Sequence, residues 1–255
     1  MSNMSNIAII TARGGSKRIP KKNIKEFCGR PIIAYSIEAA LKSKCFDEVM
    51  VSTDSEEIAE IAKKYGAKVP FLRSAETSND FATTRDVLLE VLSEYDKMGK
   101  CFDNMVCLYP TAPFITAEKL RRVLVSMKKK HASLVIPVVR FSYPPQRAYV
   151  LKDGFMKFKW EEYRNSRSQD LEPFFHDAGQ FYCYNIKDYL ACNGVITDKI
   201  VPIELPELEV QDIDNEQDWI IAEMKYKLMK GEQNVKIYRG KWEKDRRGVS
   251  HLYYC

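Results

Sequence analysis

A basic, glycine-containing segment is the stretch of this sequence best suited to bind an anion. Arg13–Asn23 holds two glycines, one serine and five Lys or Arg residues, with no acidic residue. Gly14 and Gly15 let the backbone approach a ligand closely with its N–H groups, while the cations neutralise charge. These residue types suit a polyphosphate, although a solvated surface turn has a similar composition. Neither G-x-x-x-x-G-K-[ST] nor G-x-G-x-x-G is present, so a nucleotide site here belongs to another class.

Two carboxylates near the other end of the chain could supply the cation that polyphosphate chemistry needs. Asp212 and Asp214 flank Ile213. In extended chain, alternate side chains point the same way, so the two acids project together while Ile213 turns toward the core. Mg²⁺ commonly takes one or two protein carboxylates together with substrate phosphates. The alternative is that Asp214 or Asn215 only caps the helix that follows and Asp212 is solvated.

Other polar residues give weaker signals, each with a structural alternative. Arg73 directly follows an apolar run, where it can face a ligand or solvent. Tyr109 ends another apolar run and can stack on a base or belong to the core. Asp80, Thr83 and Thr84 can bind a ligand or cap a helix, and at least one of the three is expected to be a cap.

The elements that must position these residues alternate along the chain. Apolar runs predict strands, and apolar residues at helical spacing predict helices between them. The predicted strands are 7–11, 48–52, 68–72, 105–109 and 134–139, and the predicted helices are 32–41, 55–65, 84–95 and 117–130. This order indicates an α/β fold with a doubly wound, mainly parallel sheet and right-handed crossovers. Ligands of such sheets bind beyond the carboxyl ends of the strands, and the Arg13–Asn23 segment leaves the first strand at that edge.

The pattern changes after Arg140. Residues 140–175 mix basic, aromatic and turn residues without a helical period, which indicates an arm rather than another βα unit. Further strands are predicted at 179–185 and 200–205 and a final helix at 215–230. We therefore expect one main domain over residues 1–232, followed by a basic tail over 233–255 whose role stays open.

Composition limits the partners of the protein. The formal charge is +5, but the tail holds six Lys or Arg and two acidic residues, which leaves about +1 for the rest. We expect no nucleic-acid partner, since the folded body is nearly neutral. The sequence has no run of ~18 apolar residues, so we expect no membrane partner and a cytoplasmic protein.

Cysteine and histidine usage argues against disulfides and zinc. The seven cysteines include no C-x-x-C pair, and the three histidines lie at no ligand-like spacing from them. Reduced thiols are the expected state, and no zinc site is predicted. His176–Asp177 could do acid–base work, but a structural pair is more common, and no serine or cysteine motif accompanies it.

These motifs together resemble the CMP-sialic acid synthetases, the cytidylyltransferases that activate nine-carbon acidic sugars. The landmarks occur in the family's order over residues 7 to about 230, at 10–24, 29–33, 51–54, 73, 109–113 and 212–214. The chain is most similar to the pseudaminic acid cytidylyltransferases through 69–73, 109–114 and 177–182. Sialate enzymes usually have Gln where Tyr109 stands and Arg near Ile115, and these departures disfavour N-acetylneuraminate as the substrate.

The resemblance implies a Rossmann-like nucleotidyltransferase that makes a CMP-sugar and pyrophosphate from CTP and a sugar acid, with Mg²⁺. It implies nucleotide binding by eight residues, namely Ala12, Arg13, Ser16, Lys22, Asn23, Arg73, Thr84 and Tyr109. Asp212 and Asp214 would hold the metal, and with Arg13 and Lys22 they are the expected catalytic residues. The base that takes the hydroxyl proton stays open between Asp214 and a metal-bound hydroxide.

The resemblance also assigns the 140–175 arm to a homodimer interface that reaches the neighbouring site. Arg147, Arg167 and Gln180 are then candidates for the sugar's carboxylate and acyl groups. Pseudaminic acid is the favoured substrate, and N-acetylneuraminate, legionaminate and a 3-deoxy-octulosonate are the alternatives. From a different class, a non-catalytic nucleotide-binding or nucleic-acid-binding protein could use the same basic segment.

Overall fold

The first apolar run forms β1 (Asn6–Thr11), which lies between β4 (Glu48–Ser52) and β5 (Asn104–Leu108). Both neighbours pair with β1 in the parallel direction. Every residue of β4 and of β5 is buried. Strands covered on both faces read as continuous apolar runs, which explains why the sequence showed them so clearly.

Among the described residues, the sheet has seven strands in the order β11-β6-β10-β5-β1-β4, with β9 paired to β6. The strand β10 (Phe181–Asn185) runs antiparallel between β5 and β6 (Leu134–Arg140). Next to β6 lie β11 (Ile200–Glu204), which is parallel to it, and β9 (Phe175–Asp177), which is antiparallel. The predicted doubly wound, mainly parallel α/β fold is confirmed, with antiparallel strands in its second half.

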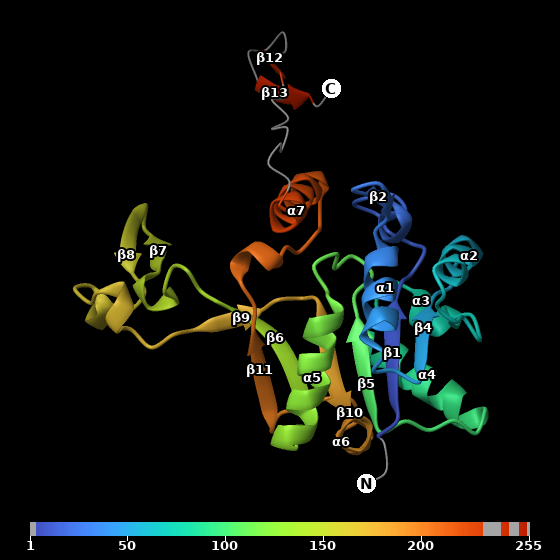
Figure 1. The fold of residues 1–255 in the computed structure, drawn as a ribbon. Coiled ribbons are helices and arrows are strands. Elements are labelled where there is room, and N and C mark those ends of the chain that lie inside the picture. Colours follow the sequence, from blue (N-terminus) through green and yellow to red (C-terminus); the bar gives the residue numbers. More distant parts are fainter. Residues whose placement is uncertain (1–3, 232–240, 245–249, 254–255) are drawn as a thin grey trace.

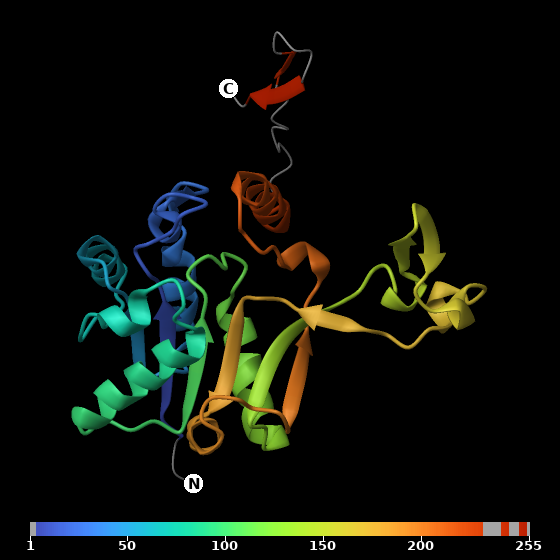
Figure 2. The ribbon, with the colours of Figure 1, turned by 180° about the vertical axis from the view of Figure 1, so that it is seen from behind.

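Helices cover both faces of the sheet, as the two opposite views show (Figure 1, Figure 2). The helices α1 (Ile33–Ser43), α2 (Glu56–Lys64) and α5 (Ala117–Lys130) pack into the apolar cluster on one face. The helices α4 (Thr84–Lys97) and α6 (Ile186–Ala191) pack into the cluster on the other. The short α6 was not predicted. Among the helices of the described residues, none is long and apolar enough to span a membrane.

The last helix, α7 (Glu216–Met229), closes a third apolar cluster away from the sheet. Trp219 and Tyr226 of α7 meet Phe27 edge to face, with ring centroids 5.6 Å apart in both pairs. Ile213, which precedes the helix, is buried in the same cluster. The C-terminal helix thereby holds the segment that carries Asp212 and Asp214 against the N-terminal part of the chain.

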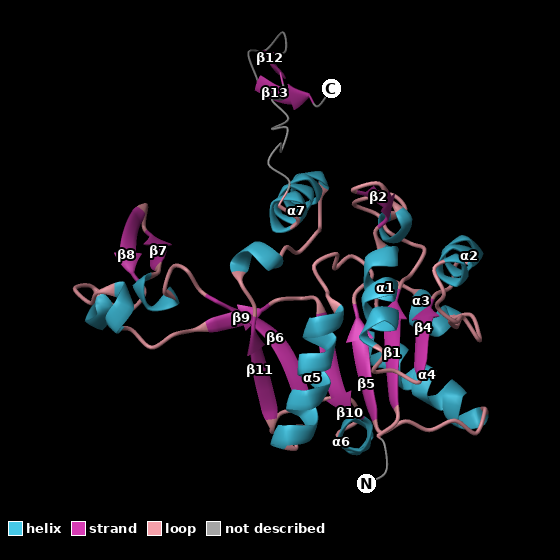
Figure 3. Cartoon of the chain, viewed as in Figure 1, coloured by secondary structure: helices cyan, strands magenta, loops and turns pink. Residues whose placement is uncertain are grey.

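The structure is a computed structural model that describes residues 4–231, 241–244 and 250–253. Short elements complete it (Figure 3), and they are β2 (Glu26–Phe27), β3 (Arg30–Pro31), α3 (Ala75–Ser78) and the 3₁₀ turns η1 (Lys22–Ile24), η2 (Pro145–Arg147), η3 (Glu161–Tyr163), η4 (Ser168–Asp170) and η5 (Glu207–Glu209). In the basic tail, β12 (Lys241–Lys244) pairs with β13 (Ser250–Tyr253). Most of the tail predicted over 233–255 lies outside the described residues.

The predicted strand over residues 68–72 is wrong. Only Lys68 pairs with the sheet, as an isolated parallel bridge to Met50. Its backbone exchanges hydrogen bonds with Val49 and Val51 at 2.9 Å. Pro70 has no N–H to continue a ladder, and the chain leaves the sheet before Arg73. The apolar run reflects packing beside the sheet edge rather than membership of the sheet.

Residues 140–175 form the expected arm. It carries a hairpin of β7 (Tyr149–Lys152) and β8 (Phe155–Phe158) and projects to one side of the sheet (Figure 1, Figure 2). Apolar side chains of the hairpin are exposed, with Leu151 and Phe155 each at 72% and Met156 at 63%. Several large apolar side chains exposed on one hairpin are typical of an interaction site.

Candidate active site

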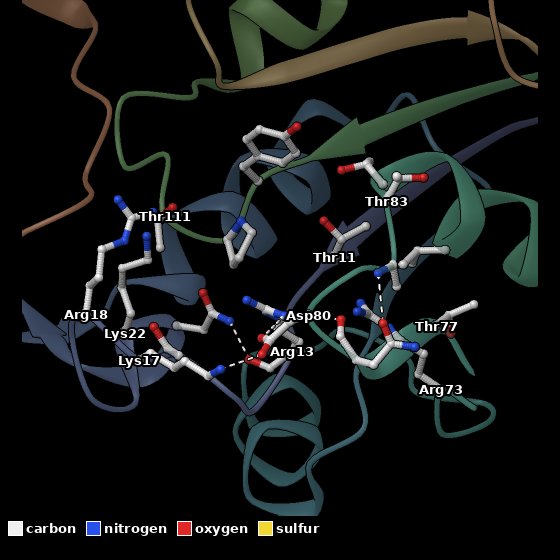
Figure 4. Close-up of a pocket in the computed structure, with 18 residues that line it drawn as sticks. Thr11, Arg13, Lys17, Arg18, Lys22, Arg73, Thr77, Asp80, Thr83 and Thr111 are labelled. Carbon is white, nitrogen blue, oxygen red and sulfur yellow. Dashed lines mark hydrogen bonds and ion pairs between the residues drawn. The ribbon is translucent and has the colours of Figure 1, made fainter. Parts of the chain in front are cut away.

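A pocket of about 500 Å³ lies at the carboxyl edge of the sheet, where β1 and β5 end (Figure 4). Four chain segments build its wall: the end of β1, the basic segment, residues 73–87 and the turn after β5. The lining residues are Thr11, Arg13, Ser16, Lys17, Arg18, Lys22, Asn23, Arg73, Thr77, Asn79, Asp80, Ala82, Thr83, Thr84, Val87, Tyr109, Pro110 and Thr111. Lys17, Arg18 and Lys22 gather on one side, opposite Arg73 and Thr77. Five Lys or Arg side chains and one acid line this concave site, so it suits an anionic ligand.

The basic segment is held close to the loop after β4. The Gly14 N–H donates to Asp54 Oδ1 at 2.8 Å. A Cβ on residue 14 would lie 3.2 Å from the Cβ of Ser55, which is closer than ordinary van der Waals contact. Glycine at this position therefore lets the basic segment approach the loop after β4. Lys21 has φ 52°, and its ammonium pairs with Glu57 outside the pocket. The turn therefore directs Lys21 away while its neighbours face the pocket.

Asp80 neutralises two cations of the pocket. It accepts from Arg13 Nη1 at 3.0 Å and also pairs with Lys17. The hydrogen bond and charge of Lys17, together with Arg13, hold the pKa of Asp80 below its ordinary value. All three side chains are about half exposed or more, so a phosphate could replace the carboxylate as their partner.

Lys22 joins the basic segment to the carboxylates at the other end of the chain. Its ammonium donates to the Ile213 carbonyl at 2.6 Å and lies 3.9 Å from Asp214 Oδ1. Burial lowers the pKa of Lys22, and the charges of Asp214 and Asp212 oppose that shift. Arg18 Nη2 pairs with Asp214 Oδ1 at 2.9 Å. Residues about 190 positions apart thus form one charged cluster.

The helix cap next to this cluster is Asn215 rather than Asp214. Asn215 Oδ1 accepts from the N–H groups of Gln217 and Asp218, which completes a capping box. Ile213 is buried, as the alternation predicted, and leaves the two flanking acids at the surface of the site. Asp214 is therefore not used as the cap.

The donor set at this site fits a hard cation that also binds phosphate. Within the described residues, no group of three or more His, Cys, Asp or Glu side chains is arranged to hold a metal ion. Asp212 and Asp214 alone would leave most coordination positions of Mg²⁺ to substrate phosphates and water, which is the usual arrangement for this ion. The cationic pocket beside them is where those phosphates would lie.

Of the other predicted nucleotide-binding residues, Arg73 and Asn23 line the first pocket and Ala12 does not. Arg73 is only 9% exposed, and its guanidinium donates to the Ser52 Oγ at 3.1 Å and the Ser52 carbonyl at 2.7 Å. Burial lowers the pKa of Arg73, with Asp54 opposing it. Asn23 Nδ2 donates to the Arg13 carbonyl at 2.8 Å. Ala12, by contrast, packs in the core and does not line the pocket, so only its backbone could contact a ligand.

Thr83 and Thr84 have separate roles. Thr83 caps α4 in a capping box with Asp86, as expected for one residue of this stretch. Thr84 and Tyr109 line the pocket near each other, and burial raises the pKa of Tyr109 while a hydrogen bond with Thr84 opposes the rise. The Tyr109 ring also meets Tyr182 edge to face at 5.7 Å.

A second pocket of about 590 Å³ shares Tyr109 with the first. Its wall comes from segments scattered over the second half of the chain, and the lining residues are Tyr109, Val139, His176, Asp177, Ala178, Gly179, Tyr182, Glu207, Val210, Gln211, Asp212 and Lys225. The Tyr182 hydroxyl donates to Asp177 Oδ2 at 2.6 Å, and Asp177 also accepts from the Gly179 N–H. Asp212 lines this pocket, whereas Asp214 lines neither pocket and contacts Arg18 and Lys22 of the first.

The three sugar-binding candidates lie outside these pockets. Arg147 and Arg167 are on the arm, where Arg147 donates to Ser168 and Arg167 pairs with Asp170 at 2.7 Å. Gln180 is buried, and its Nε2 donates to the Glu209 carbonyl at 2.6 Å. Neither pocket is lined by any of the three. Within this one chain, Gln180 supports the segment before Asp212 instead of facing a ligand.

Several lining residues were not among the predicted site residues. Lys17 and Arg18 line the first pocket, and their place in the basic segment was a usable signal. Asp80 was singled out, but its pairing with Arg13 required the fold. Nothing in the sequence marks Lys225, which lies in an ordinary helical pattern.

The described cysteines agree with the sequence. Cys28, Cys45, Cys101, Cys107, Cys183 and Cys192 form no disulfide. Burial raises the pKa of the Cys107 thiol to about 12. Such buried thiols act as small apolar side chains and take no part in the site.

Solved structures share the fold. A structure of CMP:2-keto-3-deoxy-manno-octonic acid synthetase complexed with CTP matches with a TM-score of 0.65 at 17% identity, over 89% of this chain and 99% of that one. The 4-diphosphocytidyl-2C-methyl-D-erythritol synthase of Anaerococcus prevotii matches with a TM-score of 0.59 at 18% identity, over 87% and 98% of the two chains. At such identities the similarity concerns the fold alone.

Sequence comparisons identify the family. Residues 7–172 match the model described as cytidylyltransferase. The pseudaminic acid cytidylyltransferase of Campylobacter jejuni subsp. jejuni serotype O:2 is 40% identical over 88% of this chain and 97% of its own length. The CMP-N,N'-diacetyllegionaminic acid synthase of Legionella pneumophila is 33% identical over 91% and 99% of the two chains. The protein belongs to the cytidylyltransferase family.

Proposed function

We propose that this enzyme transfers CMP from CTP to a nine-carbon sialic-type sugar acid, with pseudaminic acid as the acceptor. The observation that carries the proposal is the junction of the two pockets. The first is cationic and suits a triphosphate, the second has room for an acceptor, and they meet at Tyr109. Asp212 lines the second pocket, so an acceptor hydroxyl there would lie beside the carboxylate pair.

The choice of acceptor rests on sequence similarity. The relative named for pseudaminic acid is 40% identical to this chain, whereas the relative named for diacetyllegionaminic acid is 33% identical, over comparable lengths. The motif around Tyr109 and the 177–182 segment both border the second pocket, where an acceptor would be distinguished. Legionaminate and N-acetylneuraminate are the alternative acceptors.

The chemistry follows from where charge develops. The anomeric hydroxyl of the sugar attacks the α-phosphorus, a new P–O bond forms, and the bond to the bridging oxygen breaks and releases pyrophosphate. The hydroxyl proton would pass to Asp214, which is one of the two bases that the resemblance leaves open. Arg13, Lys17 and Lys22 would stabilise the charge on the departing pyrophosphate. Fixed cations that face developing charge are usually the largest contribution to such catalysis.

We propose Mg²⁺ as the metal, held by Asp212 and Asp214. When bound, it would polarise the phosphate oxygens and neutralise their charge. Arg18 and Lys22, which lie against Asp214, would keep that carboxylate directed toward the phosphate site. The buried Ile213 between the two acids fixes their direction.

The test is a panel of acceptors with CTP and Mg²⁺, followed by pyrophosphate release and by mass spectrometry of the CMP-sugar. The panel contains pseudaminic, legionaminic, N-acetylneuraminic and 3-deoxy-octulosonic acids. We expect the highest kcat/KM with pseudaminic acid. Preference for another acid would correct the acceptor. CTP binding with no turnover on any acid, and no Mg²⁺ dependence, would support a non-catalytic nucleotide-binding protein instead.

We also propose a homodimer built through the arm. The β7–β8 hairpin exposes Leu151, Phe155 and Met156, and few contacts hold it to the sheet within one chain. Covering this apolar surface with a second copy would also bring Arg147 and Arg167 to a neighbouring site. Light scattering should give twice the mass of one chain, and Leu151→Asp should shift it toward the monomer. A wild-type monomer with full activity would contradict the proposal.

A further inference from the structure

Lys225 is the single Lys or Arg among the described residues that line the second pocket. It comes from α7, the helix that closes the third apolar cluster. The other charged lining residues are the acids Asp177, Glu207 and Asp212, with His176 beside them. A carboxylate that entered this pocket would meet three like charges and one permanent cation.

The backbone fixes the place of the Lys225 ammonium. Its Nζ donates to the Val210 carbonyl at 2.7 Å and to the Glu207 carbonyl at 3.3 Å. An ammonium group has three N–H donors, so one remains for a ligand in the pocket. Burial lowers the pKa of Lys225, and the charge of Glu207 opposes the shift. A partly buried cation with one unused donor is an effective partner for an anion.

The arm arginines are poorer candidates within the same chain. Arg167 pairs with Asp170 at 2.7 Å, and Arg147 donates to Ser168 at 3.3 Å. Neither lines the second pocket, and both belong to the projecting arm. Lys225, in contrast, lines the same pocket as Asp212.

We propose that Lys225 binds the carboxylate of the sugar-acid acceptor and so determines the preference for an acidic sugar. The inference rests on the proposed function, because it assigns a role inside the acceptor pocket. With the carboxylate on Lys225, the anomeric hydroxyl, which is attached to the same carbon as the carboxylate in sialic-type acids, faces Asp212 and the nucleotide pocket. The lysine is therefore a specificity-determining residue that acts on acceptor binding.

The first experiment measures the two substrates separately in Lys225→Met. The KM for the sugar acid should rise by about tenfold to a hundredfold, because a charge-assisted hydrogen bond is lost. The KM for CTP should stay within about twofold, because no phosphate contact is removed. Lys225→Arg, which keeps the charge, should recover part of the acid affinity. Lys227→Met on the same helix is the matched control, since Lys227 lines neither pocket.

The second experiment removes the charge from the ligand instead of the protein. The acid that the wild-type enzyme converts best is compared with its methyl ester as a competing ligand. Wild type should bind the ester about tenfold or more weakly than the acid. Lys225→Met should bind the acid and the ester with nearly equal affinity, since the charged partner is gone.

Two results would overturn the inference. One is that Lys225→Met binds the acid as wild type does, either with an unchanged KM for the acid or with a methyl ester that still binds more weakly than the acid. This result would assign the carboxylate to another cation. The other is an equal rise of both KM values with a lower melting temperature, which would show that Lys225 only tethers residues 207–210. Failure of the proposed function is distinguishable, because wild type itself would then convert no acid of the panel.

Discussion

The two ends of the active site are held in different ways. At the nucleotide end, Arg13, Lys17 and Asp80 form ion pairs whose side chains are 40% exposed or more. At the carboxylate end, Lys119 is only 6% exposed, and its ammonium contacts Glu209 at 2.7 Å and the Phe114 carbonyl at 2.8 Å. The exposed ion pairs of Asp80 can exchange partners with little loss of free energy. Breaking the contacts of Lys119 would leave a buried charge without a partner.

The difference reflects what each end has to do. In the proposed function, the cations of the first pocket would release Asp80 and accept phosphate oxygens in its place, so weak, solvated pairs are suitable. The segment that leads to Asp212 must stay in one position, and Lys119, Gln180 and Lys225 all bind its backbone or side chains. Lys119 lies in the first turn of α5, where the helix dipole disfavours a cation, so its contacts with Glu209 explain its presence there.

Lys22→Ala should have the largest effect, because this residue connects the two ends. We expect kcat to fall by about 10²–10³-fold, as for removal of a group that stabilises the transition state, with the fold intact. Pyrophosphate release measures the loss and thermal unfolding checks the fold. Lys21→Ala is the matched control, because Lys21 pairs with Glu57 outside the pocket and should retain activity. Turnover like that of wild type in Lys22→Ala would refute the catalytic assignment.

Asp212→Ala should lower turnover nearly as much as Lys22→Ala does, because it should remove a ligand of the metal. Turnover is expected to fall by about 100-fold, and the Mg²⁺ concentration for half-maximal rate should rise. Titration of Mg²⁺ at saturating CTP and acid provides the measurement, and chelation with EDTA should abolish wild-type turnover. If the Mg²⁺ dependence of Asp212→Ala equals that of wild type, Asp212 is not a metal ligand.

Lys119→Met tests whether the carboxylate end depends on its buried anchor. Loss of the pair with Glu209 should lower the free energy of unfolding by roughly 1–3 kcal/mol, since Glu209 keeps some access to water. The melting temperature should fall by about 2–4 °C for each kcal/mol. The Mg²⁺ requirement should rise while the KM for CTP stays nearly constant. Lys129→Met, at the other end of the same helix, is the control, and equal effects of the two variants would contradict the role of Lys119.

Asp80→Asn should have the smallest effect of the four variants, and it should strengthen CTP binding instead of weakening activity. Because Asp80 competes with phosphate for Arg13 and Lys17, its neutralisation should lower the KM for CTP by about threefold or less. The effect should shrink in high salt, which screens exposed charges. A KM for CTP that rises tenfold would instead show that Asp80 holds Arg13 in its binding position, and would remove the contrast between the two ends.

Much of the fold could be predicted because the signals are local. Buried parallel strands such as β4 and β5 are continuous apolar runs, and α5 was predicted with the bounds that the structure has. The predicted strand at 68–72 failed because Pro70 and the pairing partner, rather than apolar content, decide whether a segment joins a sheet. The antiparallel direction of β10 was also beyond prediction, since strand direction depends on neighbours distant in sequence.

The basic segment could be recognised from the sequence alone as a candidate nucleotide site. Its glycines, cations and position after β1 lie within eleven consecutive residues, and the resemblance to the cytidylyltransferases supplied the ligand. The contact of Lys22 with Ile213 and Asp214, the separation of Arg147 and Arg167 from the second pocket, and the place of Lys225 in that pocket all required the folded chain. These contacts join residues separated by long stretches of chain, and they exist only after the sheet and α7 have packed, so no local pattern can encode them.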